Sequence, residues 1–266
     1  MRNLKCAIMG AMDRDEINSA AWDEEGRRGC WWTREVSSEA TSLAREGKLS
    51  LPFLLDKPLP QSWLDKAGDE VLLLGSGGGQ QGPLLSAYGK SVTVMDISAS
   101  QLARDEDAAK RDSLSLRTVR SSMSDPFPFG DGVFDSCINP VSVNFIKDPL
   151  PMYREVKRVL KDGGFFMTAF ANPALYMFDV KGLEKGKMKI KYTLPFDADV
   201  SLSEREKLIK IRNKDTFEYS HTLSKLIGGI TDLGFTILGF DTSPSGFEPI
   251  DSFLGECYLA ILARKS

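Results

Sequence analysis

The chain has 266 residues, of which 42% are hydrophobic and 27% charged, which is the composition of a globular protein rather than a disordered one. The formal net charge of −3 gives no overall basic field for a nucleic-acid backbone, so we expect no nucleic-acid partner. The longest apolar runs have only the length of strands, which predicts no transmembrane span and no membrane partner, and no signal peptide is evident at the amino terminus.

The cysteine and histidine content argues against a metal site. Four cysteines, Cys6, Cys30, Cys137 and Cys257, are scattered without a C-x-x-C pair, and the chain has one histidine. Zinc sites need clustered Cys and His ligands, so we expect no metal. Few cysteines in a chain of this length favour the cytoplasm, where thiols stay reduced. Cys137 lies within an apolar run and is expected to be a core residue.

The predicted elements begin with a loop and then a helix capped near Ser37 or Ser38. From residue 70 onward strands and helices alternate. Strands are predicted at 71–75, 91–98, 114–120, 132–140 and 165–173. Helices are predicted at 82–88, at 99–113 with Ser98 or Ser100 as cap, and from Pro149 to just before Gly163. This order indicates a doubly wound parallel sheet with helices on both faces and ligands at the carboxyl ends of the strands.

Two of these helices carry a recognisable apolar face. In the helix 99–113 the buried stripe is expected to consist of Leu102, Ala103, Ala108 and Ala109. In the helix from Pro149 the buried face is expected to consist of Met152, Val156, Val159 and Leu160.

The alternation is interrupted after the fifth strand. Residues 174–220 hold a lysine-alternating run at 185–192 and a charged helix at 201–214. Lysines at every second position are typical of the solvent face of an edge strand. A helix and a strand follow over 221–240, and a last strand over 255–265. The loop before the last strand is short, which requires the last two strands to pair antiparallel.

The most informative segment is VLLLGSGGGQQGP, which places four glycines in five residues directly after the first strand. Gly77, Gly79 and Gly82 spell G-x-G-x-x-G, the signature of a dinucleotide site, and Asp96 follows at the spacing of a ribose contact. Gly75, Gly77 and Gly79 spell G-x-G-x-G, which fits S-adenosylmethionine. The turn should begin where the strand ends, and only the second motif begins there. Placement therefore favours S-adenosylmethionine.

Two downstream motifs strengthen this interpretation. SDPFPFGDGVFDSCIN leads into the fourth strand, and YREVKRVLKDGGFF precedes the fifth. With the glycine loop and Asp96, the region 68–172 resembles the class I S-adenosylmethionine-dependent methyltransferases, in particular the methyltransferase type 11 group. The segment SGGGQQGP is similar to an uncharacterised bacterial branch of that group. The resemblance implies a Rossmann-like sheet of seven strands with an antiparallel last strand, and S-adenosyl-L-methionine as the cofactor.

The resemblance also implies a set of cofactor-binding residues at the glycine loop and the strand ends: Gly75, Ser76, Gly77, Gly79, Gln80, Asp96, Ile97, Ser122, Met123 and Asn139. Two positions depart from the family pattern. Leu73 stands where an acidic residue often precedes the glycines. Ser122 stands where an aspartate often meets the adenine amino group, and either Ser122 or the backbone of Met123 would replace that contact.

Few side chains are expected to take part in chemistry, because a sulfonium methyl is already activated and needs mainly orientation. His221 is the candidate general base, although a helix-start residue bonded to backbone is the favoured interpretation. For the substrate, Trp31 and Trp32 are candidates, of which at most one is expected to line the site while the other packs in the core. Tyr176 is a further substrate candidate, although aromatic residues in such an insertion are more often packing residues.

We therefore predict an S-adenosylmethionine-dependent methyltransferase that acts on a small-molecule acceptor. The single domain 1–266 comprises an N-terminal helical cap (1–65), a cofactor-binding core (66–173), an insertion over the active site (174–220) and a C-terminal helix with an antiparallel strand pair (221–266). Two alternatives stay open. One is a non-catalytic S-adenosylmethionine-binding module, and the other is an NAD(P)-dependent oxidoreductase that uses the loop of Gly77, Gly79 and Gly82.

Overall fold

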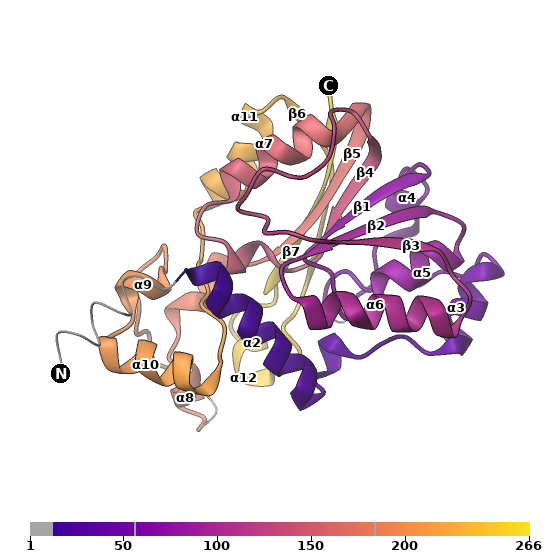
Figure 1. Ribbon diagram of the computed structural model, residues 1–266. Helices are drawn as coiled ribbons and strands as arrows, with labels where there is room; N and C mark the ends of the chain where they lie inside the picture. Colours follow the sequence, from indigo (N-terminus) through magenta and orange to yellow (C-terminus); the bar gives the residue numbers. More distant parts are fainter. Residues whose placement is uncertain (1–12, 56, 184) are drawn as a thin grey trace.

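The computed structural model describes residues 13–55, 57–183 and 185–266, and a seven-stranded sheet forms its centre (Figure 1). The strands lie in the order β3-β2-β1-β4-β5-β7-β6. Their bounds are Glu70–Leu74 (β1), Ser91–Asp96 (β2), Leu116–Arg120 (β3), Phe134–Asn139 (β4), Leu160–Ala171 (β5), Phe235–Ser243 (β6) and Tyr258–Lys265 (β7). β7 pairs antiparallel with both β5 and β6, and the other pairs are parallel. The expected sheet is confirmed.

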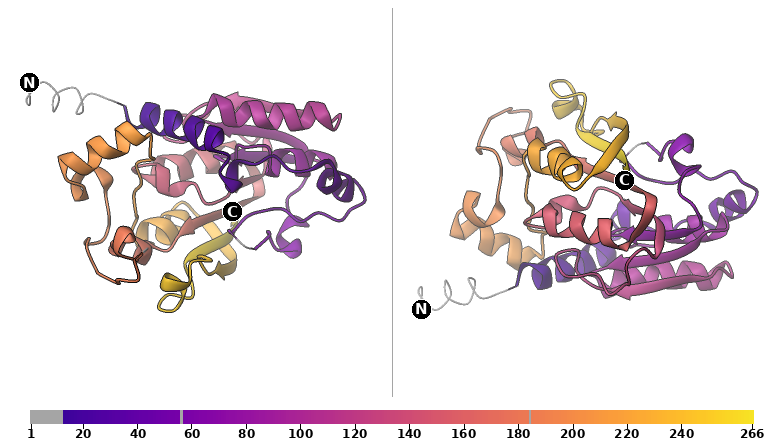
Figure 2. Two further views of the ribbon diagram at one scale, coloured as in Figure 1. Left: turned by 90° about the horizontal axis from the view of Figure 1, so that it is seen from below. Right: turned by 90° about the horizontal axis from the view of Figure 1, so that it is seen from above.

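Helices cover both faces of this sheet (Figure 2). The bounds are Arg14–Arg28 (α2), Ser38–Arg45 (α3), Gln61–Leu64 (α4), Gln81–Ala87 (α5), Ala99–Arg111 (α6), Pro149–Val159 (α7), Val180–Leu183 (α8), Ala198–Ser201 (α9), Glu204–Asn213 (α10), Gly229–Asp232 (α11) and Glu248–Asp251 (α12). A π-helical turn, Ser224–Gly228, leads into α11. No helix in the described parts of the chain is long and apolar enough to cross a bilayer.

Alternate residues of the central strands enter two different cores. Leu73 of β1 belongs to the core that packs against α3, α4 and α5. Leu72 and Leu74 belong to the core that packs against α7 and α11. Successive side chains on a strand point to opposite faces, so a strand buried on both faces is a continuous apolar run. This is why β1 reads as an unbroken apolar segment, and Cys137 of β4 is a core residue, as expected.

The helix caps follow the sequence signals. Ser37 accepts a hydrogen bond from the amide of Ala40 at the start of α3, and Ser98 accepts one from the amide of Gln101 at the start of α6. The buried face of α6 differs from the prediction at one position. Ala103 is exposed, and Asp105 takes a fully buried place beside Leu102.

Three further expectations need correction. α7 ends at Val159, and β5 begins at Leu160, so the strand starts earlier than the glycines suggested. The lysine run 185–192 forms no strand; its one ladder contact is a bridge between Phe178 and Ile190. The connection between β6 and β7 spans residues 244–257 and includes α12, so it is longer than expected, although the pair is antiparallel.

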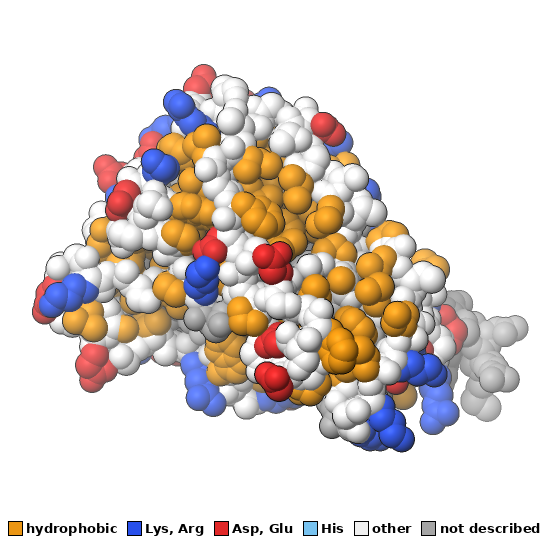
Figure 3. All heavy atoms as spheres, turned by 180° about the vertical axis from the view of Figure 1, so that it is seen from behind, with side chains coloured by type: hydrophobic (Ala, Val, Ile, Leu, Met, Phe, Trp, Pro, Cys, Tyr) orange, Lys and Arg blue, Asp and Glu red, His pale blue; other side chains and the backbone are white. Residues whose placement is uncertain are grey.

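The two edges of the sheet differ in character. β3 presents Arg117 and Arg120 at one edge, in keeping with the charged edges that discourage sheet association. β6, at the other edge, exposes about half of the side chains of Leu238 and Phe240. Seen from behind, apolar side chains spread across the middle of the molecule and are interrupted by a few charged ones (Figure 3).

The N-terminal helix and the insertion meet in a third core, which lies beyond the carboxyl ends of the strands. α2 lies beside α6 and beside the insertion helices (Figures 1 and 2). Five residues form this third core: Ile17, Phe196, Ala198, Leu202 and Phe217. Tyr176 and Tyr192 pack against it. We call α2 together with residues 174–220 the cap.

Asn18 of α2 holds the cap together. Its side-chain amide nitrogen donates to the carbonyls of Phe145 at 3.1 Å and Phe217 at 3.0 Å, and its oxygen accepts from the amide of Phe217 at 2.7 Å. The residue is only 3% exposed. A buried asparagine with these partners is well satisfied, and it joins three segments that are distant in sequence.

We predict that Asn18→Ala destabilises the protein. The change leaves buried backbone groups of Phe217 and Phe145 without partners, and we expect the free energy of unfolding to fall by about 2–3 kcal/mol. Chemical denaturation measures this loss. Arg27→Ala, an exposed change on the same helix, is the control and should stay within about 0.5 kcal/mol of the wild type. An equally small loss for Asn18→Ala would show that these hydrogen bonds do not hold the cap.

Candidate functional site

The glycine loop begins directly where β1 ends, because Leu74 is the last residue of the strand and Gly75 has φ +54°. A Cβ at Gly75 would lie 2.7 Å from the Ser142 hydroxyl oxygen and 3.0 Å from the Met123 methyl carbon. A side chain therefore does not fit there, and the positive φ independently favours glycine. The turn starts at Gly75, as the G-x-G-x-G interpretation requires.

Asp96, at the end of β2, is joined to the glycine loop. One carboxylate oxygen accepts from the amide of Gly77 at 3.1 Å, and the other accepts from the amide of Ser98 at 2.8 Å. Asp96 is only 8% exposed, and burial raises the pKa of its carboxyl, against these backbone hydrogen bonds. A Cβ at Gly77 would lie 2.9 Å from the carboxylate, so this close approach needs glycine.

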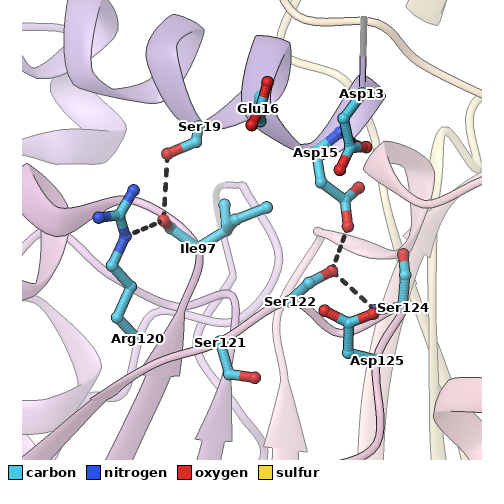
Figure 4. A pocket seen from close by; sticks show the side chains of 10 residues that line it. All are labelled: Asp13, Asp15, Glu16, Ser19, Ile97, Arg120, Ser121, Ser122, Ser124 and Asp125. Carbon is cyan, nitrogen blue, oxygen red and sulfur yellow. Dashed lines mark hydrogen bonds between the residues drawn. The ribbon is translucent and has the colours of Figure 1, made fainter. Parts of the chain in front are cut away.

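A cavity of about 570 Å³ lies between α2 and the ends of β2 and β3 (Figure 4). Its lining from α2 and its N-cap consists of Asp13, Asp15, Glu16 and Ser19. The opposite lining consists of Ile97, Arg120, Ser121, Ser122, Ser124 and Asp125. In Figure 4 the Asp15 side chain points from the helix toward Ser122 in the loop that follows β3. Four carboxyl groups and one guanidinium line the cavity, which gives it an acidic character.

The helix is fastened to the rim of this cavity by hydrogen bonds. The Ser19 hydroxyl donates to the carbonyl of Ile97 at 3.1 Å, and the Ser122 hydroxyl donates to the carboxylate of Asp15. At the start of α6, the hydroxyls of Ser98 and Ser100 donate to the carboxylate of Asp23 at 2.6 and 2.7 Å. α2 therefore forms one wall of the cavity.

A second polar group lies at the ends of β1 and β4. The side-chain amide of Asn139 donates to the carbonyl of Leu74 at 2.9 Å and to the Ser142 hydroxyl at 2.6 Å, and its oxygen accepts from Thr168 at 3.2 Å. Its nitrogen is also 3.5 Å from the sulfur of Met123. Asn139 is fully buried and joins neighbouring strands. The structure thus brings Met123 and Asn139 to Gly75, and Ile97 and Ser122 to the cavity.

Asp105 lies fully buried beneath the glycine loop. Within the described ranges, neither of its carboxyl oxygens has a hydrogen-bond partner. Burial raises the pKa of Asp105 to about 8; the nearby backbone amides of Gly79 and Gly78 oppose this shift, and the charges of Asp96 and Glu35 reinforce it. A Cβ at Gly82 would lie 2.7 Å from the carboxyl, so this acid packs directly against the start of α5. The carboxyl is expected to be largely protonated near neutral pH.

Three sequence candidates lie at the outer side of the glycine loop. The side-chain nitrogen of Gln80 donates to the carbonyls of Trp31 and Arg34, at 3.1 and 3.2 Å, and so ties the loop to the N-terminal segment. Trp31 and Trp32 are 49% and 42% exposed, with ring centroids 5.5 Å apart in an edge-to-face pair. Neither tryptophan packs in the core, so the expectation that one would do so is wrong.

His221 and Tyr176 lie away from this cavity lining. The Nε2 of His221 donates to the carbonyl of Val143 at 3.2 Å, and burial lowers the pKa of the ring, which favours the neutral form. His221 thus holds the turn after β4. Tyr176 stacks on Phe196 with ring centroids 5.6 Å apart and donates from its hydroxyl to Glu218 at 2.9 Å. Tyr176 packs in the cap, as insertion aromatics commonly do.

Sequence reasoning missed the cavity residues that α2 supplies. Asp13 is the N-cap of α2, Asp15 and Glu16 are acidic residues of its first turn, and Gly29 ends it in the left-handed conformation. These end signals were present in the sequence. The interior of the helix shows little apolar periodicity, because its buried face includes Asn18 and Ser19.

Comparison with known proteins gives the class. Residues 72–168 match the family described as "Methyltransferase domain". The solved structure of an S-adenosylmethionine-dependent methyltransferase from Mesorhizobium loti is similar, with TM-score 0.57 and 19% identity, over 77% of this chain and 95% of that one. A geranyl diphosphate C-methyltransferase from Streptomyces coelicolor, solved with S-adenosyl-L-homocysteine, has TM-score 0.52 and 18% identity, over 77% and 76%. The fold is therefore that of S-adenosylmethionine-dependent methyltransferases.

A sequence relative carries the assignment further. The Bacillus subtilis protein described as "Uncharacterized methyltransferase YbaJ" is 37% identical over 231 residues, which cover 86% of this chain and 91% of that protein. This chain belongs to the methyltransferase family.

We predict that Asp105→Asn changes how stability depends on pH. The pKa of Asp105 is about 8 in the folded protein, against an ordinary value of 3.8. Between these pH values the folded protein keeps a proton on Asp105 that the unfolded chain releases. The contribution of Asp105 to stability is complete below the lower value and is lost as pH rises through the higher one. Asparagine does not titrate. The mutant's stability relative to wild type should therefore rise from about pH 5 to about pH 8, by up to about 1.4 kcal/mol per pH unit.

Denaturant titrations of both proteins across this range measure the difference, in which the titration of all other groups cancels. A difference that stays constant with pH would show that Asp105 titrates normally in the folded protein.

Proposed function

We propose that this chain transfers the methyl group of S-adenosylmethionine to a small-molecule acceptor that binds beneath the cap. The observation that carries the proposal is the cavity between α2 and the ends of β2 and β3, whose lining residue Ile97 directly follows Asp96, the carboxylate bonded to the glycine loop. Its volume of about 570 Å³ is that of a small-ligand site. We propose that the chain acts as one unit, with the cap closing over the sheet.

The polar groups of the glycine loop and of the end of β2 fit an adenosyl ligand. A carboxylate has about four acceptor positions, and the amides of Gly77 and Ser98 use two of those on Asp96, which leaves capacity for ribose hydroxyls. The Ser76 hydroxyl is buried and, among the described residues, has no hydrogen-bond partner, as expected of a group that a polar ligand satisfies.

Bound S-adenosylmethionine would supply an electrophilic methyl, so the task of the protein is orientation and exclusion of water. Asp96 and the glycine loop would fix the adenosyl end. Asn139 holds the ends of β1, β4 and β5 in register beside Gly75. His221 positions the turn after β4 through Val143, and we propose that it acts through this turn rather than as a general base.

Three observations support a small-molecule acceptor. α2 is hydrogen-bonded to the residues that follow β2 and β3 and shares an apolar core with the insertion, which supports a site covered by the cap. The net charge is negative and the cavity lining is acidic, which disfavours a polyphosphate backbone. The similar Streptomyces enzyme is named for geranyl diphosphate, a small molecule. We also propose a cytoplasmic location, which the free thiols of Cys30, Cys137 and Cys257 support.

We predict that the protein binds S-adenosylhomocysteine but not NADH, and that it transfers label from methyl-labelled S-adenosylmethionine to a component of a metabolite extract. Asp96→Ala should weaken S-adenosylhomocysteine at least about tenfold, because the ribose loses an ionised acceptor. Calorimetry measures the affinities. Asp107→Ala, an exposed change on α6, is the matched control and should leave the affinity unchanged.

The outcomes separate the alternatives. Binding of NADH alone would replace the proposal with an oxidoreductase. Binding of S-adenosylhomocysteine without transfer in any of many extracts would favour a non-catalytic module. Label recovered in RNA rather than in a small molecule would contradict the acceptor class.

A further inference from the structure

A carboxylate from the N-terminal helix reaches the loop that follows β3. Asp15 lies in the first turn of α2, and its carboxylate accepts a hydrogen bond from the Ser122 hydroxyl, 107 positions away in the sequence (Figure 4). The Ser122 hydroxyl in turn accepts from the amide of Ser124 at 2.9 Å. These two hydrogen bonds orient the Ser122 hydroxyl toward Asp15. The carboxylate is therefore held by the same loop that forms the opposite wall of the cavity.

The position of Asp15 is fixed from the other side as well. Ser19, one helical turn later, donates to the carbonyl of Ile97, and Asn18 is bonded within the cap. Asp15 is half-buried, whereas its neighbours Asp13 and Glu16 are exposed. Ser122 occupies one of about four acceptor positions of the carboxylate, so Asp15 has acceptor capacity for a donor that enters the cavity.

The surroundings restrict what that donor is. The Ile97 side chain offers an apolar wall on which a flat ring can lie, and the acids of the lining exclude an anionic group. Arg120, the one basic lining residue, donates from Nε to the carbonyl of Ile97 at 3.1 Å. A planar heterocycle that carries an amino group satisfies these conditions, since its ring packs on an apolar surface while its N–H groups meet a carboxylate.

This inference rests on the proposed function: we infer that Asp15 recognises the adenine of the cofactor by accepting a hydrogen bond from its exocyclic amino group. The N-terminal helix then supplies a specificity-determining residue to the cofactor site, at the place where Ser122 alone offers only a hydroxyl. A base that carries a carbonyl oxygen at this position would place two acceptors against each other and bind less well.

The test compares two ligands that differ at this one group. S-adenosyl-L-homocysteine carries the amino group, and S-inosyl-L-homocysteine carries a carbonyl oxygen instead. Calorimetry with the full chain should give the wild type a preference of about tenfold or more for the adenosyl ligand. In Asp15→Asn the side-chain NH₂ can donate to the carbonyl oxygen, so the preference should fall to about threefold or less.

Glu16→Gln is the matched control, because it removes the same charge from the same helix and cavity lining. It should change both affinities by a similar factor and keep the ratio of the wild type. Thermal melting verifies that each variant folds. If Asp15→Asn does not fold, Asp15→Ser replaces it, and it should also lower the ratio of the adenosyl to the inosyl affinity.

Each outcome bears on a distinct claim. A ratio that stays at the wild-type value in folded Asp15 variants, or that falls equally in Glu16→Gln, overturns the role of Asp15. Equal binding of both ligands by the wild type also overturns the role of Asp15, but it leaves the proposed function in place. Binding of neither ligand by the wild type overturns the proposed function itself.

Discussion

The contact between the Asp96 carboxylate and the Gly77 amide is the constraint on which the site depends. It joins the turn after β1 to the turn after β2 and so fixes the loop at the carboxyl end of the parallel strands. The distance of 3.1 Å is possible because Gly77 has no side chain; a Cβ would lie 2.5 Å from the Cβ of Gln101. The glycine thus serves the close packing of the two turns.

The cap builds on this base. α2 crosses the ends of β2 and β3 and contacts the insertion, and Arg14 pairs with Asp199 at 2.6 Å across that junction. Burying a helix there requires hydrogen-bond partners for its polar side chains. Asn18 is bonded to Phe217, Ser19 to Ile97 and Asp23 to Ser98. The cavity exists because this helix stands over the strand ends, and the segments that form its two walls are distant in the sequence.

Sequence patterns predicted the sheet because its central strands are mostly apolar runs between capped helices, and the antiparallel last strand was also correct. α2 was missed because its buried face includes Asn18 and Ser19, which hide the apolar period; the cap at Asp13 and the glycine at 29 were the available signals. The buried Asp105 could not be predicted, since an aspartate on a charged helix reads as solvent-exposed. Lysines also alternate with other residues over 185–192, but this segment pairs with no strand in the described parts of the chain. An alternating pattern alone does not decide whether a segment joins a sheet.

Amide hydrogen exchange with and without S-adenosylhomocysteine tests most directly the claim that the cofactor lies between α2, the glycine loop and the ends of β2 and β3. We predict that the ligand slows exchange in α2 and in residues 121–125, which contribute to the cavity lining, and in the glycine loop 75–82, which is bonded to Asp96, and that it leaves β6 unchanged. Protection that is absent from α2 and the 121–125 loop while the ligand is bound would contradict this account of the site.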